Sequence, residues 1–358
     1  MKLKANFTKH TLQFTFRAGT SRGTLTEHDT YYIILTRNHT VGIGECAPLP
    51  GLSPDYRLDL EQKIEELLSH LPELSIPSSS NEMISLVQQL IPAEFPGLRF
   101  GLETAYRDLL NGGERKIYPS VFQQGSFPPI PINGLVWMGD KDFMKRQIDE
   151  KLAQGFTCIK MKIGAIDFDT ELLLLSYIRE NYSAREITVR VDANGAFPPE
   201  EAEKKLEQLA KLNLHSIEQP IAVGQLKEMR QLCQNPLLPI ALDEELIGVH
   251  GLSVQAALLD QIQPQYIILK PTLLGGLAAT EQWIQLAEAR SIGWWMTSAL
   301  ESNIGLNAIA QLAAHKKVSD PQGLGTGKLY YNNITSPLRI DSGQLHYDAN
   351  QPWDISFL

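Results

Sequence analysis

Short apolar runs alternate with longer amphipathic segments from about residue 131 onward. Each run has the length of a β-strand, and each segment after it has the length and spacing of a helix. Repeated strand–helix alternation is typical of parallel strands joined by crossover helices. The pattern therefore predicts a (β/α)-barrel, with a doubly wound open sheet as the alternative. After a first strand PINGLVW (131–137), the six strand-like runs are TCIKMKI (157–163), EITVRVDAN (186–194), HSIEQPI (215–221), PIALDEEL (239–246), YIILKP (266–271) and IGWWMTSAL (292–300).

The first part of the chain has a different order of strand-like and helical segments. The β-rich run YYIILT (31–36) precedes three amphipathic helical segments at 59–71, 81–91 and 97–113. Strands followed by helices favour an α+β module. We therefore expect a capping domain over 1–120, a barrel over 121–325, and a C-terminal segment over 326–358. Within that last segment, PLRIDSGQLHYD (337–348) is expected to form a hairpin that packs on the first module.

Composition narrows the class of protein. The 358 residues carry a net charge of −9 and no basic cluster, which argues against binding nucleic acid or an anionic membrane. No apolar run approaches the length of a membrane span. The three cysteines, Cys46, Cys158 and Cys233, are far apart and form neither a CxxC metal site nor a disulfide framework. These features predict a cytoplasmic protein and leave the oligomeric state open.

Each of five consecutive strand-like runs has a charged residue at its carboxyl end. The intervals between these residues are about 25 to 30 residues, the length of one βαβ unit, so the same structural position recurs. In a barrel the carboxyl ends of the strands converge on one mouth, where active sites lie. The five residues are Lys162, Asp192, Glu218, Asp243 and Lys270.

The types of these residues suggest a metal site. A single acid at a strand end is usually a helix cap or a loop charge, but three converging carboxylates repel one another unless a cation lies between them. Hard oxygen ligands favour Mg²⁺, with Mn²⁺ as a substitute, over zinc. Lys160 and Lys162 are two residues apart on one strand, so they share a face and need an anion opposite them.

Five ordered motifs give a resemblance to a known family. The chain resembles the enolase superfamily in its muconate-lactonizing branch, and the GIGECAPLPG stretch (42–51) agrees with the capping domain of that branch. The resemblance implies a modified (β/α)-barrel, TIM-like, with an α+β capping domain built from the N-terminal region and the C-terminal tail. The motifs are KMK (160–162), DAN (192–194), EQP (218–220), DEE (243–245) and LKP (269–271).

Among families of this branch, the chain is most similar to the o-succinylbenzoate synthases of menaquinone biosynthesis. The stretches TSRGTLTE (20–27) and SALES (298–302) add to this similarity. The resemblance implies a metal-dependent syn dehydration of a small-molecule carboxylate, 2-succinyl-6-hydroxy-2,4-cyclohexadiene-1-carboxylate, through an enediolate.

The resemblance also implies a role for each candidate residue. Lys162 would be the general base, Lys160 would favour its neutral form and stabilise the enolate, and Lys270 would act from the opposite side. Mg²⁺ would bind the three carboxylates. The expected metal ligands are Asp192, Glu218 and Asp243, and the residues expected to support them or contact substrate are Asn194, Glu244, Ser298, Glu301 and Arg22.

Several alternatives stay open on the sequence. An N-acylamino acid racemase would share every catalytic position. A dipeptide epimerase typically carries an Asp-x-Asp on the last strand, and the corresponding region GLGTGKLYYNN (323–333) has no acid. A Schiff-base aldolase would not need three converging acids. A non-catalytic carboxylate-binding protein would not need lysines on both sides of those acids. We also expect the loop at 17–28 to close over the mouth as a lid, with a plain surface hairpin as the alternative.

Overall fold

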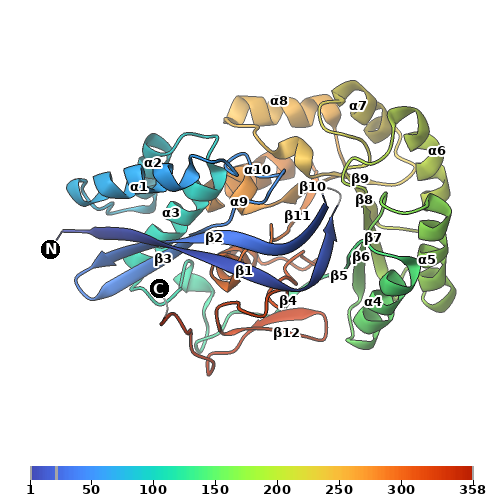
Figure 1. Ribbon diagram of the computed structural model, residues 1–358. Coiled ribbons are helices and arrows are strands. Elements are labelled where there is room, and N and C mark those ends of the chain that lie inside the picture. Colours follow the sequence, from blue (N-terminus) through green and yellow to red (C-terminus); the bar gives the residue numbers. More distant parts are fainter. Residues whose placement is uncertain (1, 21–22, 357–358) are drawn as a thin grey trace.

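The computed structural model describes residues 2–20 and 23–356 and consists of a barrel and a smaller cap (Figure 1). The barrel contains a parallel sheet whose strands neighbour one another in chain order, which confirms the predicted strand–helix units. A doubly wound sheet would reverse its strand order at a switch point, so that alternative is wrong. The strands are β5 (Gly134–Val136), β6 (Cys158–Lys162), β7 (Thr188–Asp192), β8 (Ser216–Glu218), β9 (Ile240–Leu242), β10 (Tyr266–Leu269) and β11 (Gly293–Met296).

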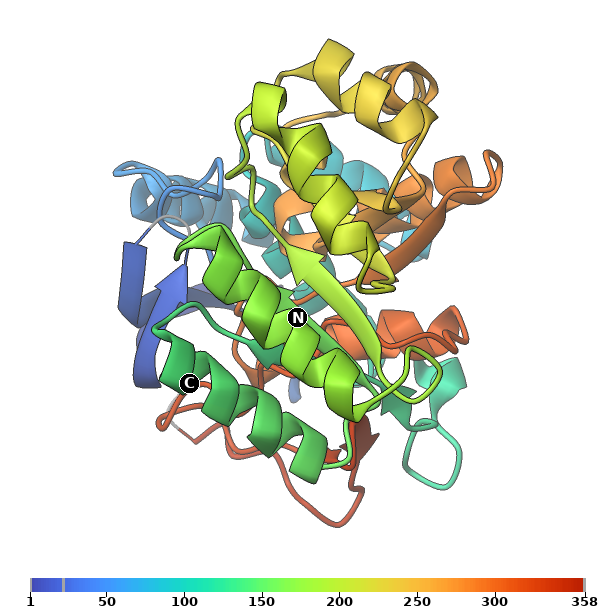
Figure 2. The same ribbon diagram turned by 90° about the vertical axis from the view of Figure 1, so that its right-hand side faces the viewer.

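Helices cover the outside of this sheet. Figure 2 looks at the barrel from its helical side and shows the green and yellow helices lying across the strands. Strand residues that alternate with the inward-facing ones, such as Ile159 and Met161 of β6, are fully buried beneath them. The helices are α4 (Lys141–Ala153), α5 (Phe168–Asn181), α6 (Pro199–Ala210), α7 (Leu226–Gln234), α8 (Leu252–Ile262), α10 (Leu277–Glu288) and α11 (Asn303–His315).

A two-residue segment after α11 joins the edges of the sheet. Gln322 forms a parallel bridge with Ile132, beside β5, and Gly323 forms one with Thr297, directly after β11. The N–H of Gly323 donates to the carbonyl of Met296 at 2.7 Å, and the side-chain oxygen of Gln322 accepts from the N–H of Met296 at 2.8 Å. The barrel is thus closed by a short bridge that stands in place of an eighth strand.

The cap is an antiparallel three-stranded sheet with three helices. The strands β1 (Lys4–Thr20), β2 (Gly23–Arg37) and β3 (Thr40–Cys46) pair in order, and the predicted helices are present as α1 (Leu60–His70), α2 (Ser80–Leu90) and α3 (Pro96–Leu110). One hydrophobic cluster, running from Leu3 to Leu109, lies between these elements. No helix among the described residues is long and apolar enough to span a membrane.

The C-terminal hairpin has a different partner from the one expected. It forms as β12 (Leu338–Asp341) and β13 (Gln344–Tyr347), but β13 pairs with β4 (Ile130–Pro131), which directly precedes the first barrel strand β5. The prediction that the hairpin packs on the first module is wrong, because its buried residues join the barrel core. The flanks of the hairpin reach the cap instead, where Ile334 packs with β2 and β3.

Glu45 of β3 anchors the cap to the barrel. Its buried carboxylate lies at the N-terminus of α11, where backbone N–H groups lack partners within the helix. It accepts hydrogen bonds from the N–H and the hydroxyl of Ser302 at 2.7 and 2.6 Å and from the N–H of Gly305 at 2.7 Å. The hydroxyl of Thr30 donates a fourth at 2.8 Å. This contact fixes the start of α11 and the loop before it.

We expect Glu45 to make stability depend on pH. Burial raises the pKa of Glu45 from 4.5 to about 7, and the hydrogen bonds from Ser302 and Thr30 only partly oppose this. Because the folded pKa lies above the unfolded one, the folded chain binds this proton more tightly. The stabilisation is complete below about pH 4.5 and is lost as the pH rises through about 7, by about 3 kcal/mol in all.

Urea denaturation at pH 5 and pH 8 measures this effect. Glu45→Gln should show a smaller loss of unfolding free energy between the two pH values than the unmodified chain. It should also be less stable at pH 5, because an amide NH₂ would face backbone N–H donors. Other buried acids, such as Asp55 and Asp108, titrate in both proteins, so the comparison isolates Glu45. An equal pH dependence in both proteins would contradict the assignment.

Candidate active site

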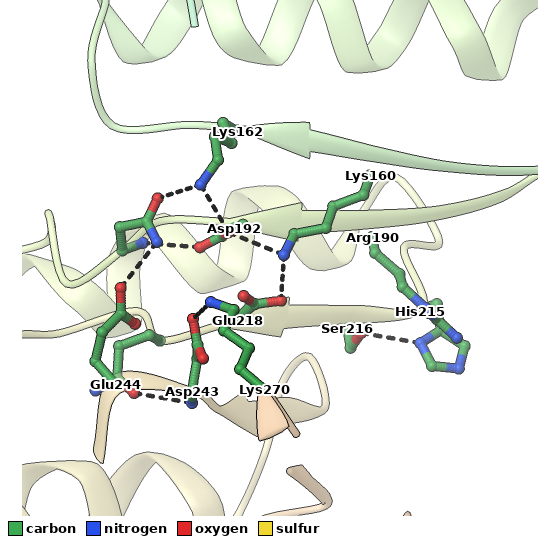
Figure 3. A network of polar contacts seen from close by, with 12 residues as sticks. Lys160, Lys162, Arg190, Asp192, His215, Ser216, Glu218, Asp243, Glu244 and Lys270 are labelled. Atoms are coloured by element: carbon green, nitrogen blue, oxygen red, sulfur yellow. Dashed lines mark hydrogen bonds and ion pairs between the residues drawn. The ribbon is translucent and has the colours of Figure 1, made fainter. Parts of the chain in front are cut away.

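Lys160 and Lys162 lie on one face of β6, and both reach the end of the neighbouring strand (Figure 3). Their Nζ atoms are 3.0 and 3.1 Å from the same oxygen, Oδ2 of Asp192. The Lys160 amino group is also 2.6 Å from Oε2 of Glu218. The anionic groups opposite the paired lysines are thus two carboxylates of the protein itself, those of Asp192 and Glu218.

The charged strand ends do converge. Asp192 ends β7, Glu218 ends β8, and Asp243 directly follows β9; each of the three is at most 2% exposed. Lys270 directly follows β10 and forms an ion pair with Oδ2 of Asp243. Lys162 and Lys270 therefore approach the carboxylates from two sides, as Figure 3 shows.

Attraction between opposite charges dominates the ionisation of Asp192, Lys160 and Lys270. Burial would raise the pKa of Asp192, but the charges of Lys160 and Lys162 outweigh it and hold that pKa well below its ordinary value. Burial would likewise lower the pKa of Lys160, but Asp192 and Glu218 raise it. Burial would lower the pKa of Lys270 too, but the charges of Asp243, Glu218 and Glu244 together raise it. Lys160 and Lys270 are therefore cations in this arrangement.

The three carboxylates fit a metal through one oxygen of Glu218. Within residues 2–20 and 23–356, no three His, Cys, Asp or Glu side chains are placed to hold a metal jointly, and Lys160 lies between Asp192 and Glu218. However, Oε1 of Glu218 is buried and has no hydrogen-bond partner among the described residues. Burial and the charge of Asp192 raise the pKa of Glu218 well above its ordinary value. Such an unpartnered oxygen among like charges fits a hard divalent cation.

Asn194 links the cluster to Glu244. Its side-chain oxygen accepts from Nζ of Lys162 at 2.8 Å, and its Nδ2 donates to Oε1 of Glu244 at 3.0 Å. Its backbone φ is 45°, a left-handed conformation that asparagine tolerates better than most residues. Asn194 thereby orients Lys162, and Glu244 in turn orients Asn194.

The remaining predicted residues lie in different places. Ser298 lines the cavity described below, whereas Glu301 is fully buried behind it. Glu301 accepts hydrogen bonds from the hydroxyls of Ser298 and Thr272 and so holds the loop in place. Arg22 lies outside the described residues.

A cavity of about 660 Å³ opens above the cluster. Its volume is in the range of small-molecule sites. Lys160, Lys162, Asp192, Asn194 and Lys270 form its polar floor. The cap and the strand ends supply a largely apolar wall that includes Leu25, Leu49, Leu52, Trp137, Phe143 and Leu300.

The tip of the first hairpin lies beside this cavity. Thr20, Gly23, Thr24 and Leu25, at the ends of β1 and β2, contribute to its wall. The segment expected to form a lid is therefore at the mouth, although most of it is strand and not loop. Its closure over a substrate stays a prediction.

Sequence reasoning missed the apolar wall. Leu49 and Leu52 follow the GIGEC stretch, and Trp137 ends the first barrel run, so none of the three positions carries a charge that marks it. Leu300 has a left-handed backbone, with φ of 68°, which is rare for a leucine. Its carbonyl accepts from the hydroxyl of Tyr330 at 2.7 Å, which helps to hold this conformation.

Comparisons with known proteins agree with this geometry. A family model described as enolase C-terminal domain-like matches residues 143–353. An o-succinylbenzoate synthase from Desulfotalea psychrophila is 45% identical and covers 96% of this chain and 98% of its own length. The crystal structure of MenC from Desulfotalea psychrophila LSv54 has a TM-score of 0.87 and 42% identity, covering 96% of this chain and 99% of its own.

A more distant structure has the same fold. It is the dipeptide epimerase from Enterococcus faecalis V583 complexed with Mg and the dipeptide L-Leu-L-Tyr, with a TM-score of 0.84. The match covers 98% of this chain and 100% of that one at 20% identity, so it bears on the fold alone.

Proposed function

The chain belongs to the enolase C-terminal domain-like family, and from this premise we propose that it is an o-succinylbenzoate synthase, a hydro-lyase of menaquinone biosynthesis. The observation that carries the proposal is the position of Lys162 and Lys270 on two sides of buried carboxylates, in a chain 45% identical to such an enzyme. The substrate would be 2-succinyl-6-hydroxy-2,4-cyclohexadiene-1-carboxylate, and the products 2-succinylbenzoate and water.

The reaction needs a base next to the substrate carboxylate. Lys162, as the neutral amine, takes the proton from the ring carbon that bears this carboxylate, and an enediolate forms. The cations Lys160 and Lys270 line the same cavity and stabilise its negative charge. The protonated Lys162 then gives its proton to the departing hydroxyl group, which leaves as water from the same face, and the ring becomes aromatic.

A divalent metal is part of this proposal. Members of the superfamily depend on one, and we propose Mg²⁺, held here by Asp192, Glu218 and Asp243. When bound, it supplies positive charge to the substrate carboxylate. Asn194 keeps Lys162 in place during the proton transfer through the hydrogen bond to its amino group. We also infer a reducing, cytoplasmic setting, because all three cysteines are free and buried.

The cavity wall argues against a dipeptide epimerase. Lys151 and Lys328 both contribute to it, and a dipeptide ammonium would be repelled by their charge. A racemase that acts on N-acylated amino acids, which carry no ammonium, is the second candidate, since it would use the same two lysines. A non-catalytic carboxylate-binding protein would not need amines on both sides of the bound carboxylate.

A parallel assay tests the proposal. We expect the purified chain with Mg²⁺ to convert the cyclohexadiene substrate, followed by the loss of its ultraviolet absorbance, with a larger kcat/KM than for racemisation of an N-succinylamino acid. Racemisation without dehydration would favour the second candidate. Binding of both compounds with no turnover of either would favour the non-catalytic alternative.

A further inference from the structure

A second pair of cations lies in the wall of the cavity, apart from the lysines of its floor. Lys151 projects from α4, and Lys328 lies in the segment that follows the barrel-closing bridge. These two positions are 177 residues apart by their numbers in the chain, and neither ends a strand. Only the fold brings them to one cavity. The mechanism proposed above uses neither residue.

The side chain of Lys151 packs closely against strand β5 of the barrel. Its stem crosses β5 at Gly134, where an added Cβ would lie only 3.0 to 3.1 Å from three of its carbons. Those distances are shorter than ordinary carbon contacts, so the glycine provides the space for the stem. The Lys151 amino group lies 5.4 Å from the centre of the Phe156 ring. A lysine that merely extended into solvent would not need a cleared path across a strand.

The two amino groups have no ion-pair partner within the described part of the chain, although the charge of Glu150 acts on Lys151. Neither Lys151 nor Lys328 forms an ion pair there, unlike the three lysines of the floor. Burial lowers the pKa of Lys151; Glu150 opposes this, and the charge of Lys328 adds to it. Two neighbouring cations in a partly buried wall repel each other, and an anion between them would remove this repulsion.

We propose that Lys151 and Lys328 form a second anion site in this cavity and bind the distal, succinyl carboxylate of the substrate. This inference rests on the proposed function, which supplies a substrate with two carboxylates. The ring carboxylate lies on the polar floor, the ring and methylene groups contact the apolar wall, and the distal carboxylate reaches the lysine pair. Glu150, an exposed acid that also lines the cavity, weakens the site and offers a test of opposite sign.

Two ligands that differ in one carboxylate test the site. Calorimetry in the presence of Mg²⁺ would compare 2-succinylbenzoate with 2-butanoylbenzoate, in which a methyl group replaces the distal carboxylate. Lys151→Met keeps the stem and removes the charge. We expect it, and Lys328→Met, to weaken 2-succinylbenzoate binding by about 10- to 100-fold, the effect of a charge-assisted hydrogen bond. Binding of 2-butanoylbenzoate should not change. Glu150→Gln should tighten 2-succinylbenzoate binding.

The matched control is Lys145→Met on the same helix, where Lys145 pairs with Asp149 at 3.0 Å on the surface. It should bind both ligands normally. In the dehydration assay the Lys151 and Lys328 variants should raise KM with little change in kcat, as expected when ground state and transition state lose the same contact. Should Lys151→Met fail to fold, the exposed Lys328 still supplies the test.

The outcomes separate this inference from the proposed function. Equal losses for both ligands, or no loss for either, would overturn the second anion site while leaving the dehydratase assignment intact. A chain that prefers 2-succinylbenzoate through these lysines but does not dehydrate the cyclohexadiene would keep the anion site and refute the activity.

Discussion

Replacing Lys162 with alanine should lower kcat for the dehydration by about 10²–10⁴-fold, the usual contribution of a general base. The loss of positive charge near the enediolate should add to this effect. The fold should persist, because Lys160 still pairs with Asp192 after the substitution. Single-turnover kinetics measure the loss of rate, and a thermal melt of the variant measures whether the fold persists. Dehydration by Lys162→Ala at the unmodified rate would show that the base has been assigned wrongly.

Lys270 provides the matched comparison. Lys270→Ala should also be badly impaired, through lost electrostatic stabilisation, but the two variants should differ in hydrogen exchange. In ²H₂O, with an N-succinylamino acid as probe, each lysine should exchange the α-proton of one enantiomer, because they approach from opposite sides. Lys270→Ala should keep the exchange that Lys162 catalyses, and Lys162→Ala should show the reverse. Loss of the same enantiomer in both variants would contradict this arrangement.

Removal of divalent metal should abolish turnover, and Mg²⁺ or Mn²⁺ should restore it. The reason is the cluster of three buried carboxylates, one of which has an oxygen that no group in the described part of the chain contacts by a hydrogen bond. Full activity in excess chelator would refute the metal assignment.

Glu218→Gln gives a readout independent of activity. It removes one ligand charge and the unpartnered carboxylate oxygen, so calorimetric Mg²⁺ affinity should fall by at least about 10-fold, as for loss of a charged contact. Glu245→Gln is the control, since Glu245 is also buried but accepts hydrogen bonds from the side-chain amide of Gln219 and the N–H of Gly224. Its Mg²⁺ affinity should stay near that of the unmodified chain. Equal affinity in the Glu218 variant would exclude Glu218 as a ligand.

The polar floor of the cavity could be predicted from the chain because its residues obey local rules. A strand alternates its faces with a period of two, so Lys160 and Lys162 must share a face. Parallel strands end at one edge, so acids that end successive strands must come together. Neither argument needs to know which distant element packs against which.

No such local rule determines which residues form the cavity wall or which distant segments join the cap, the barrel and the C-terminal hairpin. From the sequence alone, Glu45 cannot be distinguished from a loop charge. Its role depends on the N-terminus of α11, where the N–H of Gly305 donates to its carboxylate. The C-terminal hairpin could be predicted as a hairpin, but its partner β4 could not, because the edge strands β1 and β3 of the cap sheet could also accept a strand. Lys151 sits on an ordinary amphipathic helix, and nothing near it in the chain indicates that Gly134 leaves room for its stem.

The sequence by itself determined the order of strands and helices, the face of each strand and the meeting of lysines with carboxylates at one end of a barrel. Those features depend on backbone periodicity and on the spacing of one repeated unit. Only the tertiary structure decided how Gln322 and Gly323 close the barrel, how Glu45 fixes the cap, and that Lys151 and Lys328 share a cavity. The physical reason is that hydrophobic burial drives elements together without direction, so the choice of partners emerges only when all of them pack at once.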